Sequence, residues 1–164
     1  MTAKNARHHR MHRRSALAAI ALIATLPALA SAQSAGAPIV QVKAKGSVEQ
    51  VLGQIKKMVA SNGMMVMGEL HQGKVIGMTG LKVESETIFV GNPTVGKQLF
   101  GANPGVGIAV PVRINVFQDA SGGTVVSYVP PSVLLKAFND SKIDKVAGML
   151  DGKLQKMFGM LGGM

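Results

Sequence analysis

Apolar residues recur at helical spacing in two long stretches of this chain. From Val48 to Val59 they lie three or four positions apart with polar residues between them, which predicts an amphipathic helix. Ser47 is a candidate N-cap for this helix, and Asn62-Gly63 is a candidate end. A second stripe predicts a long C-terminal helix, and this stripe contains Ile143, Val146, Leu150, Leu154, Met157 and Leu161. Covering a face of a sheet is the favoured role of this helix, and docking of its lysine-edged stripe on anionic lipid is the alternative.

Five shorter segments, rich in β-branched and other apolar residues and bounded by glycine or proline, predict strands. They span residues 39–44, 64–70, 87–90, 110–117 and 124–129. Short helices are predicted at 94–100 and 132–138, and residues 71–86 form the least regular stretch. This order predicts an α+β fold in which an antiparallel or mixed sheet has helices on one face.

The first 32 residues follow a different pattern. Five cations within the first fourteen residues precede an uncharged run from Ala16 to Ala30. Such a run is typical of a signal peptide, and it is shorter than the roughly 20 residues that a transmembrane helix needs. Ala30-Ser31-Ala32 is a small-x-small pattern, which predicts cleavage between Ala32 and Gln33. Arg13-Arg14 leaves the twin-arginine route open beside the favoured general secretory route.

We therefore expect a signal peptide at 1–32, a flexible leader at 33–38 and a single domain at 39–164, in the periplasm or outside the cell. Removing the five cations of the signal peptide from the 18 in the chain leaves 13 basic and 8 acidic residues, a net charge near +5. Twelve of these cations are scattered lysines, and the chain has one tyrosine and no tryptophan. Without stacking platforms, nucleic-acid binding is excluded as a function. The absence of cysteine excludes disulfides and thiolate metal sites.

Residues 88–96, Ile-Phe-Val-Gly-Asn-Pro-Thr-Val-Gly, followed by Val-Pro-Val-Arg-Ile at 110–114, resemble domain-of-unknown-function family 302. The resemblance covers about residues 47–133. The family's Phe-Gly-Asn-Pro run is found here with one residue, Val90, inserted. The resemblance implies a TATA-binding-protein-like β-α-β4-α arrangement, pairing as a homodimer, and no established activity.

Many members of that family carry an Asp-His pair that opens a helix where this chain has residues 69–74. Here Gly73, Gly77 and Gly80 follow, and glycine lowers helix propensity. We therefore expect any helix at this position to be weak.

Residues 91–98 nearly match the phosphate-binding loop G-x-x-x-x-G-K-[ST]. Gln98 replaces the hydroxyl residue that would hold magnesium, and Pro93 removes a backbone N–H donor. We interpret the segment as a tight turn from a strand into a helix, in which Gly91 and Asn92 satisfy the turn and cap the helix.

Polar candidates for chemistry are few. His71 is the only histidine after residue 32, and Glu69 lies two positions before it, on the same side of an extended strand. Such a pair is suited to acid–base catalysis. Arg113, the only arginine of the mature chain, together with Asn92 is a candidate for ligand binding, because a guanidinium binds carboxylate or phosphate bidentately. A structural ion pair is the favoured alternative for Arg113.

Methionine is abundant, with nine in the mature chain. Met65, Met67 and His71 together are candidate Cu(I) ligands, because thioethers and imidazole suit that ion. Alternation along a strand places Met64 on the opposite face from Met65 and Met67, so the three sulfurs cannot converge. Filling of an irregular core is the favoured role for these residues.

These patterns favour a non-catalytic domain that binds a small ligand or a protein partner between sheet and helices. No cofactor is expected. The alternatives are a hydrolase or transferase that uses Glu69, His71 and Arg113, and a copper-handling protein that uses Met and His. An enzyme would be favoured if one pocket were lined by Glu69, His71, Asn92 and Arg113. Dispersal of these residues would favour a binding domain.

We predict that the protein recovered from a bacterial periplasm has the mass of residues 33–164, because the peptidase cleaves after Ala32. Intact-mass spectrometry measures this directly, and native spectra of the same sample report pairing of chains and any added ligand mass. A chain that keeps residues 1–32 would contradict the cleavage.

Overall fold

The computed structural model describes residues 38–162. The predicted signal peptide, the Ala32–Gln33 cleavage site and most of the predicted leader lie outside these residues. Within them, five strands form one antiparallel sheet in the order β1-β5-β4-β3-β2, so the predicted α+β class is confirmed. The strands are β1 (Val40–Ala44), β2 (Met65–Leu70), β3 (Ser85–Gly91), β4 (Val112–Gln118) and β5 (Thr124–Tyr128).

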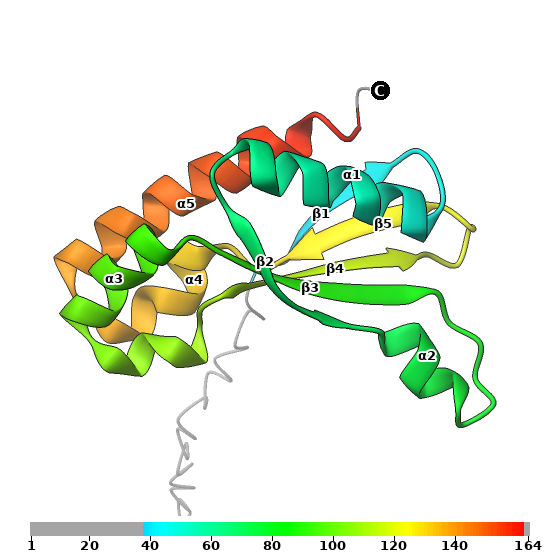
Figure 1. The fold of residues 1–164 in the computed structure, drawn as a ribbon, viewed down its shortest axis with the longest axis horizontal. Coiled ribbons are helices and arrows are strands. Elements are labelled where there is room, and N and C mark those ends of the chain that lie inside the picture. Colours follow the sequence, from blue (N-terminus) through cyan, green and yellow to red (C-terminus); the bar gives the residue numbers. More distant parts are fainter. Residues whose placement is uncertain (1–37, 163–164) are drawn as a thin grey trace, which may run out of the picture. The chain divides into compact units, whose positions relative to one another are not determined.

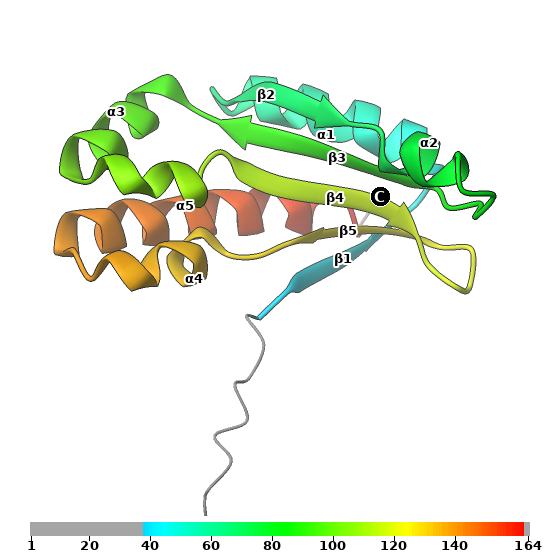
Figure 2. The ribbon, with the colours of Figure 1, turned by 90° about the horizontal axis from the view of Figure 1, so that it is seen from below.

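The helices connect and cover these strands (Figure 1). They are α1 (Val48–Ser61), α2 (Gln72–Gly77), α3 (Pro93–Ala102), α4 (Pro131–Leu135) and α5 (Ser141–Gly159), with short 3-10 turns η1 (Pro104–Ile108) and η2 (Lys136–Phe138). Figures 1 and 2 show α1 and α5 over one face of the sheet, as the sequence predicts, whereas α2 projects on the other side. None of the helices within residues 38–162 is long and apolar enough to cross a membrane.

The main core lies between the sheet and the two covering helices. Ser47 and Gln50 begin α1 with a reciprocal capping box, in which each side chain accepts from the other residue's backbone N–H, at 3.2 and 2.9 Å. The ring of Tyr128 on β5 lies 5.4 Å from that of Phe158 on α5, tilted by 54°. The largest fully buried members of this core are Phe158, Ile55, Ile88, Ile114, Leu154, Met157 and Leu161.

A second, smaller core lies where α3, η1, α4 and α5 meet. The first half of α5 supplies Ile143, Ala147 and Leu150 to it, and the second half supplies Leu154 and Phe158 to the main core. One continuous helix therefore holds both cores together.

A β-bulge at Met67 changes which side chains face the helices. Val66 pairs with Val90, but the next pair is Gly68 with Phe89, so Met67 is the extra residue on β2. Glu69 consequently lies opposite Ile88, a residue of the main core, and points to the side covered by α1. Without the bulge, alternation from Val66 would have directed Glu69 to the opposite face.

Two segments differ from the sequence prediction. Residues 71–86, expected to be irregular, contain α2, and residues 104–108 form the unpredicted turn η1. Local propensity does not account for α2, since it is short and contains Gly73 and Gly77. Contacts with the sheet hold it in place, and they are described with the site below.

The buried phenol of Tyr128 gives a pH-dependent test of the fold. Burial raises the pKa of Tyr128 above its ordinary 10.0, and the nearby carboxylate of Asp151 adds to the rise. The native state therefore favours the neutral phenol. Its contribution to stability is fully present below pH 10 and is lost as the pH rises through the raised native pKa.

We predict that ultraviolet absorbance, which reports this single tyrosine in a chain without tryptophan, shows a higher Tyr128 pKa in the native protein than in urea. The unfolding free energy of the Tyr128→Phe variant should decrease less at alkaline pH than that of the unaltered protein, because this variant has no phenol to ionise. Equal native and unfolded titration curves would contradict the prediction.

Candidate functional site

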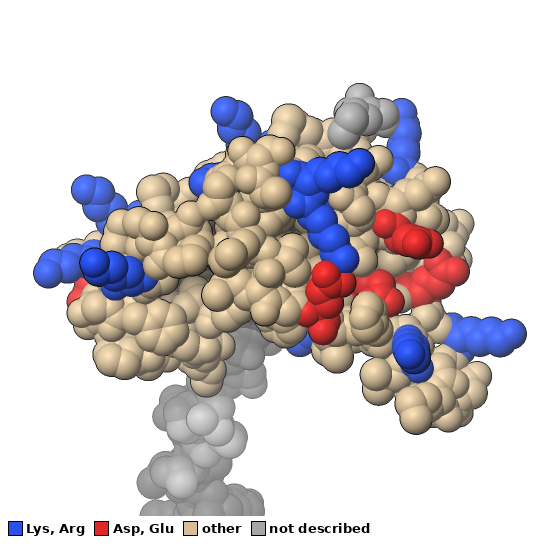
Figure 3. All heavy atoms as spheres, in the orientation of Figure 1, with Lys and Arg blue, Asp and Glu red and all other residues tan. Residues whose placement is uncertain are grey.

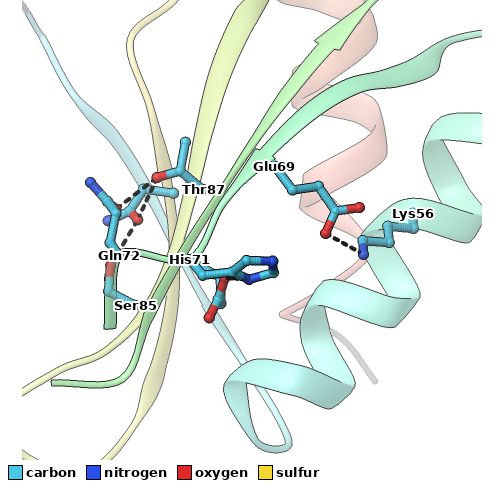
Figure 4. A network of polar contacts seen from close by, with 8 residues as sticks. Lys56, Glu69, His71, Gln72, Ser85 and Thr87 are labelled. Atoms are coloured by element: carbon cyan, nitrogen blue, oxygen red, sulfur yellow. Dashed lines mark hydrogen bonds and ion pairs between the residues drawn. The ribbon is translucent and has the colours of Figure 1, made fainter. Parts of the chain in front are cut away.

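Glu69 and His71 line the same shallow hollow beside the start of α1, but they do not pair with each other. Glu69 Oε2 lies 2.8 Å from Lys56 Nζ on α1, and His71 Nδ1 lies 2.7 Å from Glu86 Oε2 on β3. Figure 4 shows Glu69 directed at Lys56, and His71 directed to the same side of the sheet. Glu69 and His71 thus lie on the same side of the sheet, as the sequence predicts. Each contacts a different partner, so they form no ion pair with each other.

Both ion pairs are partly exposed to solvent. Pairs of this kind contribute roughly 0–1 kcal/mol each to stability. The same hollow is lined by two serines, whose hydroxyls have structural roles. Ser47 caps α1, and Ser85 is hydrogen-bonded to Gln72 and Asn115.

The candidate copper ligands are not gathered either. Met64 is buried in the main core, whereas Met65 and Met67 are exposed. Met67 covers Gly91, where an added Cβ would lie 2.5 Å from the Met67 sulfur. Met67 lines a different hollow from His71, and residues 38–162 contain no group of three or more His, Cys, Asp or Glu arranged to hold a metal.

Asn92 has a structural role at the start of α3. Its side-chain oxygen accepts from the backbone N–H of Val95 at 3.0 Å, and its amide donates to the backbone oxygen of Gly63. Asn92 thereby caps α3 and ties it to the end of α1. The interpretation of this segment as a turn from a strand into a helix capped by Asn92 is confirmed.

Arg113 lies on the sheet face opposite α1 and α5, because its neighbours Val112 and Ile114 are in the main core. It lines an open groove with polar neighbours Asn115 and Ser127. The ion pairs found within residues 38–162 do not include Arg113, so the favoured structural ion pair is not formed in that part of the chain.

A polar cluster that the sequence analysis missed attaches α2 to this face. The hydroxyls of Ser85 and Thr87 lie 2.8–3.2 Å from two acceptors, Gln72 Oε1 and Asn115 Oδ1. Thr87 is fully buried although it faces away from the covering helices, because Gln72 lies over it (Figure 4). The alternation of Ser85 and Thr87 is the only sequence signal of this cluster, and it does not identify Gln72 as the partner.

An apolar cavity of about 170 Å³ lies at the junction of the two cores. It lies between the ends of β3 and β4, α3 and α5, with Asn92 at its margin. Met67 and Phe100, both about half-exposed, flank it. Its other apolar walls include Met64, Val90, Val95, Leu99, Val110, Pro111, Val112 and Leu150.

Comparison with known proteins places this geometry in a family. The chain matches the family described as "Domain of unknown function DUF302" over residues 40–161, and it belongs to that family. The match extends beyond the 47–133 expected from the resemblance. No curated protein matches the chain.

One solved structure with this fold is the crystal structure of an uncharacterized conserved DUF302 protein from Bacillus stearothermophilus. It is 18% identical, with a TM-score of 0.70, and the similarity covers 75% of this chain and 97% of that chain. At this identity the comparison shows the fold alone.

Substitutions at two glycines of α2 can test the close packing of this helix against the segment before β3. A Cβ on Gly73 would lie 2.5 Å from the Val83 carbonyl oxygen and 3.2 Å from the Ser85 nitrogen, whereas one on Gly77 would meet nothing within 4 Å. We predict that Gly73→Ala destabilises the domain by about 1–3 kcal/mol through overpacking. Gly77→Ala should be neutral or slightly stabilising. Urea unfolding and amide exchange of residues 72–84 measure both, and equal effects would contradict the close approach at Gly73.

Proposed function

We propose that this protein is an exported, non-catalytic binding domain that holds a small apolar molecule in the cavity beside α3. The apolar cavity at the junction of the two cores is the observation that carries the proposal. A cavity of about 150 Å³ with apolar walls is large enough for benzene. The 170 Å³ here therefore suit a single ring or a branched alkyl group.

The dispersal of the polar candidates supports binding over catalysis. Glu69 and His71 line one hollow, Asn92 lies at the margin of the apolar cavity, and Arg113 lines the groove on the opposite sheet face. Acid–base and nucleophilic chemistry need such groups within hydrogen-bond reach of one reacting atom. This arrangement does not favour the hydrolase or transferase alternative.

Export and pairing complete the proposal. The signal-peptide pattern of residues 1–32 supports action in the periplasm or outside the cell, and the resemblance to the family supports a homodimer. The sheet face that α1 and α5 leave open includes Phe89, with Ile108 beside it 91% exposed, and burial against a second copy would remove such surface from water.

Two glycines of α3 provide a matched test of the cavity. Gly96 lines the cavity, Gly101 lies on the other side of the helix, and a Cβ on either would meet nothing within 4 Å. Leucine at either position favours the helix, so both variants should fold. We predict that toluene raises the Tm of the unaltered protein and of Gly101→Leu, and that Gly96→Leu weakens its binding by about tenfold or more, since the side chain occupies the cavity.

Titration by ligand-observed NMR checks the same ranking. If Gly96→Leu and the unaltered protein bound toluene with equal affinity, toluene would bind outside this cavity. A lack of toluene binding to the unaltered protein would contradict the cavity as a binding site.

A further inference from the structure

The segment between β2 and β3 leaves an unusual number of large apolar side chains in solvent. We call residues 72–83 the α2 lobe. The helix in this lobe buries none of its residues. The exposed apolar side chains are Val75 (54% exposed), Ile76 (41%), Met78 (86%), Leu81 (59%) and Val83 (39%).

The charge of the α2 lobe has one sign. Lys74 and Lys82 are its only charged residues, and no acidic residue occurs between Gln72 and Val83. In Figure 3 the only charged side chains that project from the lobe are basic, and acidic side chains lie on the body above it. The exposed surface of the α2 lobe is therefore apolar and basic.

The α2 lobe is also held in a fixed position. It projects from the sheet on the side away from α1 and α5 (Figures 1 and 2). Gln72 anchors its start through Ser85 and Thr87, and Gly73 allows close approach to the backbone of Val83. The apolar side chains are thus presented without a folding step, which lowers the entropic cost of docking.

We propose that the α2 lobe docks on the surface of an anionic lipid bilayer. Apolar side chains flanked by lysines are the chemistry of interfacial anchors, in which the apolar groups enter the acyl boundary and the ammonium groups reach the headgroups. Glu84 and Glu86 follow directly after the lobe and would be repelled by the same headgroups. Insertion is therefore limited to the lobe itself.

A second copy of the chain fits the α2 lobe less well. A stable protein interface takes about 800 Å² from each partner, which is a large area for a projection of this length. Pairing two lobes face to face would also bring four lysines together. A fluid anionic surface needs neither a matching shape nor an acidic partner site.

The test is co-sedimentation of the protein, residues 33–164, with vesicles of phosphatidylglycerol and phosphatidylcholine in equal parts, and with phosphatidylcholine alone. Binding is expected to the mixed vesicles and to fall with added salt. The double substitution Met78→Ser and Leu81→Ser should weaken the partition by about tenfold or more. Lys74→Gln with Lys82→Gln should reduce both the affinity and its salt dependence.

Met149→Ser is the matched control, because Met149 is also about half-exposed and lies beside Lys142 and Lys145 on α5. It should bind vesicles like the unaltered protein. The docking proposal is overturned if the unaltered protein does not bind, if the Met78 and Leu81 variant binds equally, or if those substitutions instead abolish self-association. The urea midpoint of each variant reports whether its fold is intact, and toluene binding reports on the cavity. A loss of vesicle binding with toluene binding retained therefore concerns the docking proposal alone, and the proposed function is tested separately.

Discussion

The apolar stripe of α5 is the contact that the rest of the domain depends on. Its second half, with Leu154 and Phe158, closes the core over the sheet, and its first half, with Ile143 and Leu150, holds α3 and α4. The chain has no cysteine, so packing alone joins these two parts. The cavity lies where the two halves meet, and Leu150 belongs both to its wall and to the second core.

This placement links the fold to the proposed function. The main core lies between two layers, the sheet and the helices α1 and α5, whose side chains interdigitate closely. The second core is built from short helices and turns around one long helix, and the space left between the two is apolar. A site of this kind selects ligands by size and apolar character, because its walls offer few polar groups to orient a substrate.

The sequence predicted the parts of the fold that follow from periodicity. Helix α1, the five strands and α5 all have regular apolar spacing, and the residues between Gly91 and Pro93 marked the turn that starts α3. Helix α2 could not be predicted in this way, because Gln72 is held by Ser85 and Thr87, which are distant in sequence. The cavity has the same origin, since its walls come from five separate elements.

The candidate site was predicted less well for two specific reasons. The bulge at Met67 leaves no mark in the amino-acid pattern, yet it decides the direction of Glu69. Lys56 and Glu86, the actual partners of Glu69 and His71, lie 13 and 15 positions away along the chain. Spacing between near neighbours therefore could not identify these pairs.

The same bulge has a consequence for how copies of this domain can meet. β2 forms one edge of the sheet, and a strand from another molecule could extend the sheet only along a regular row of free backbone groups. The extra residue at Met67 interrupts that row halfway along β2. Growth of the sheet from one molecule into the next is therefore hindered at β2, and an added strand would find a regular row only at β1, the opposite edge of the sheet.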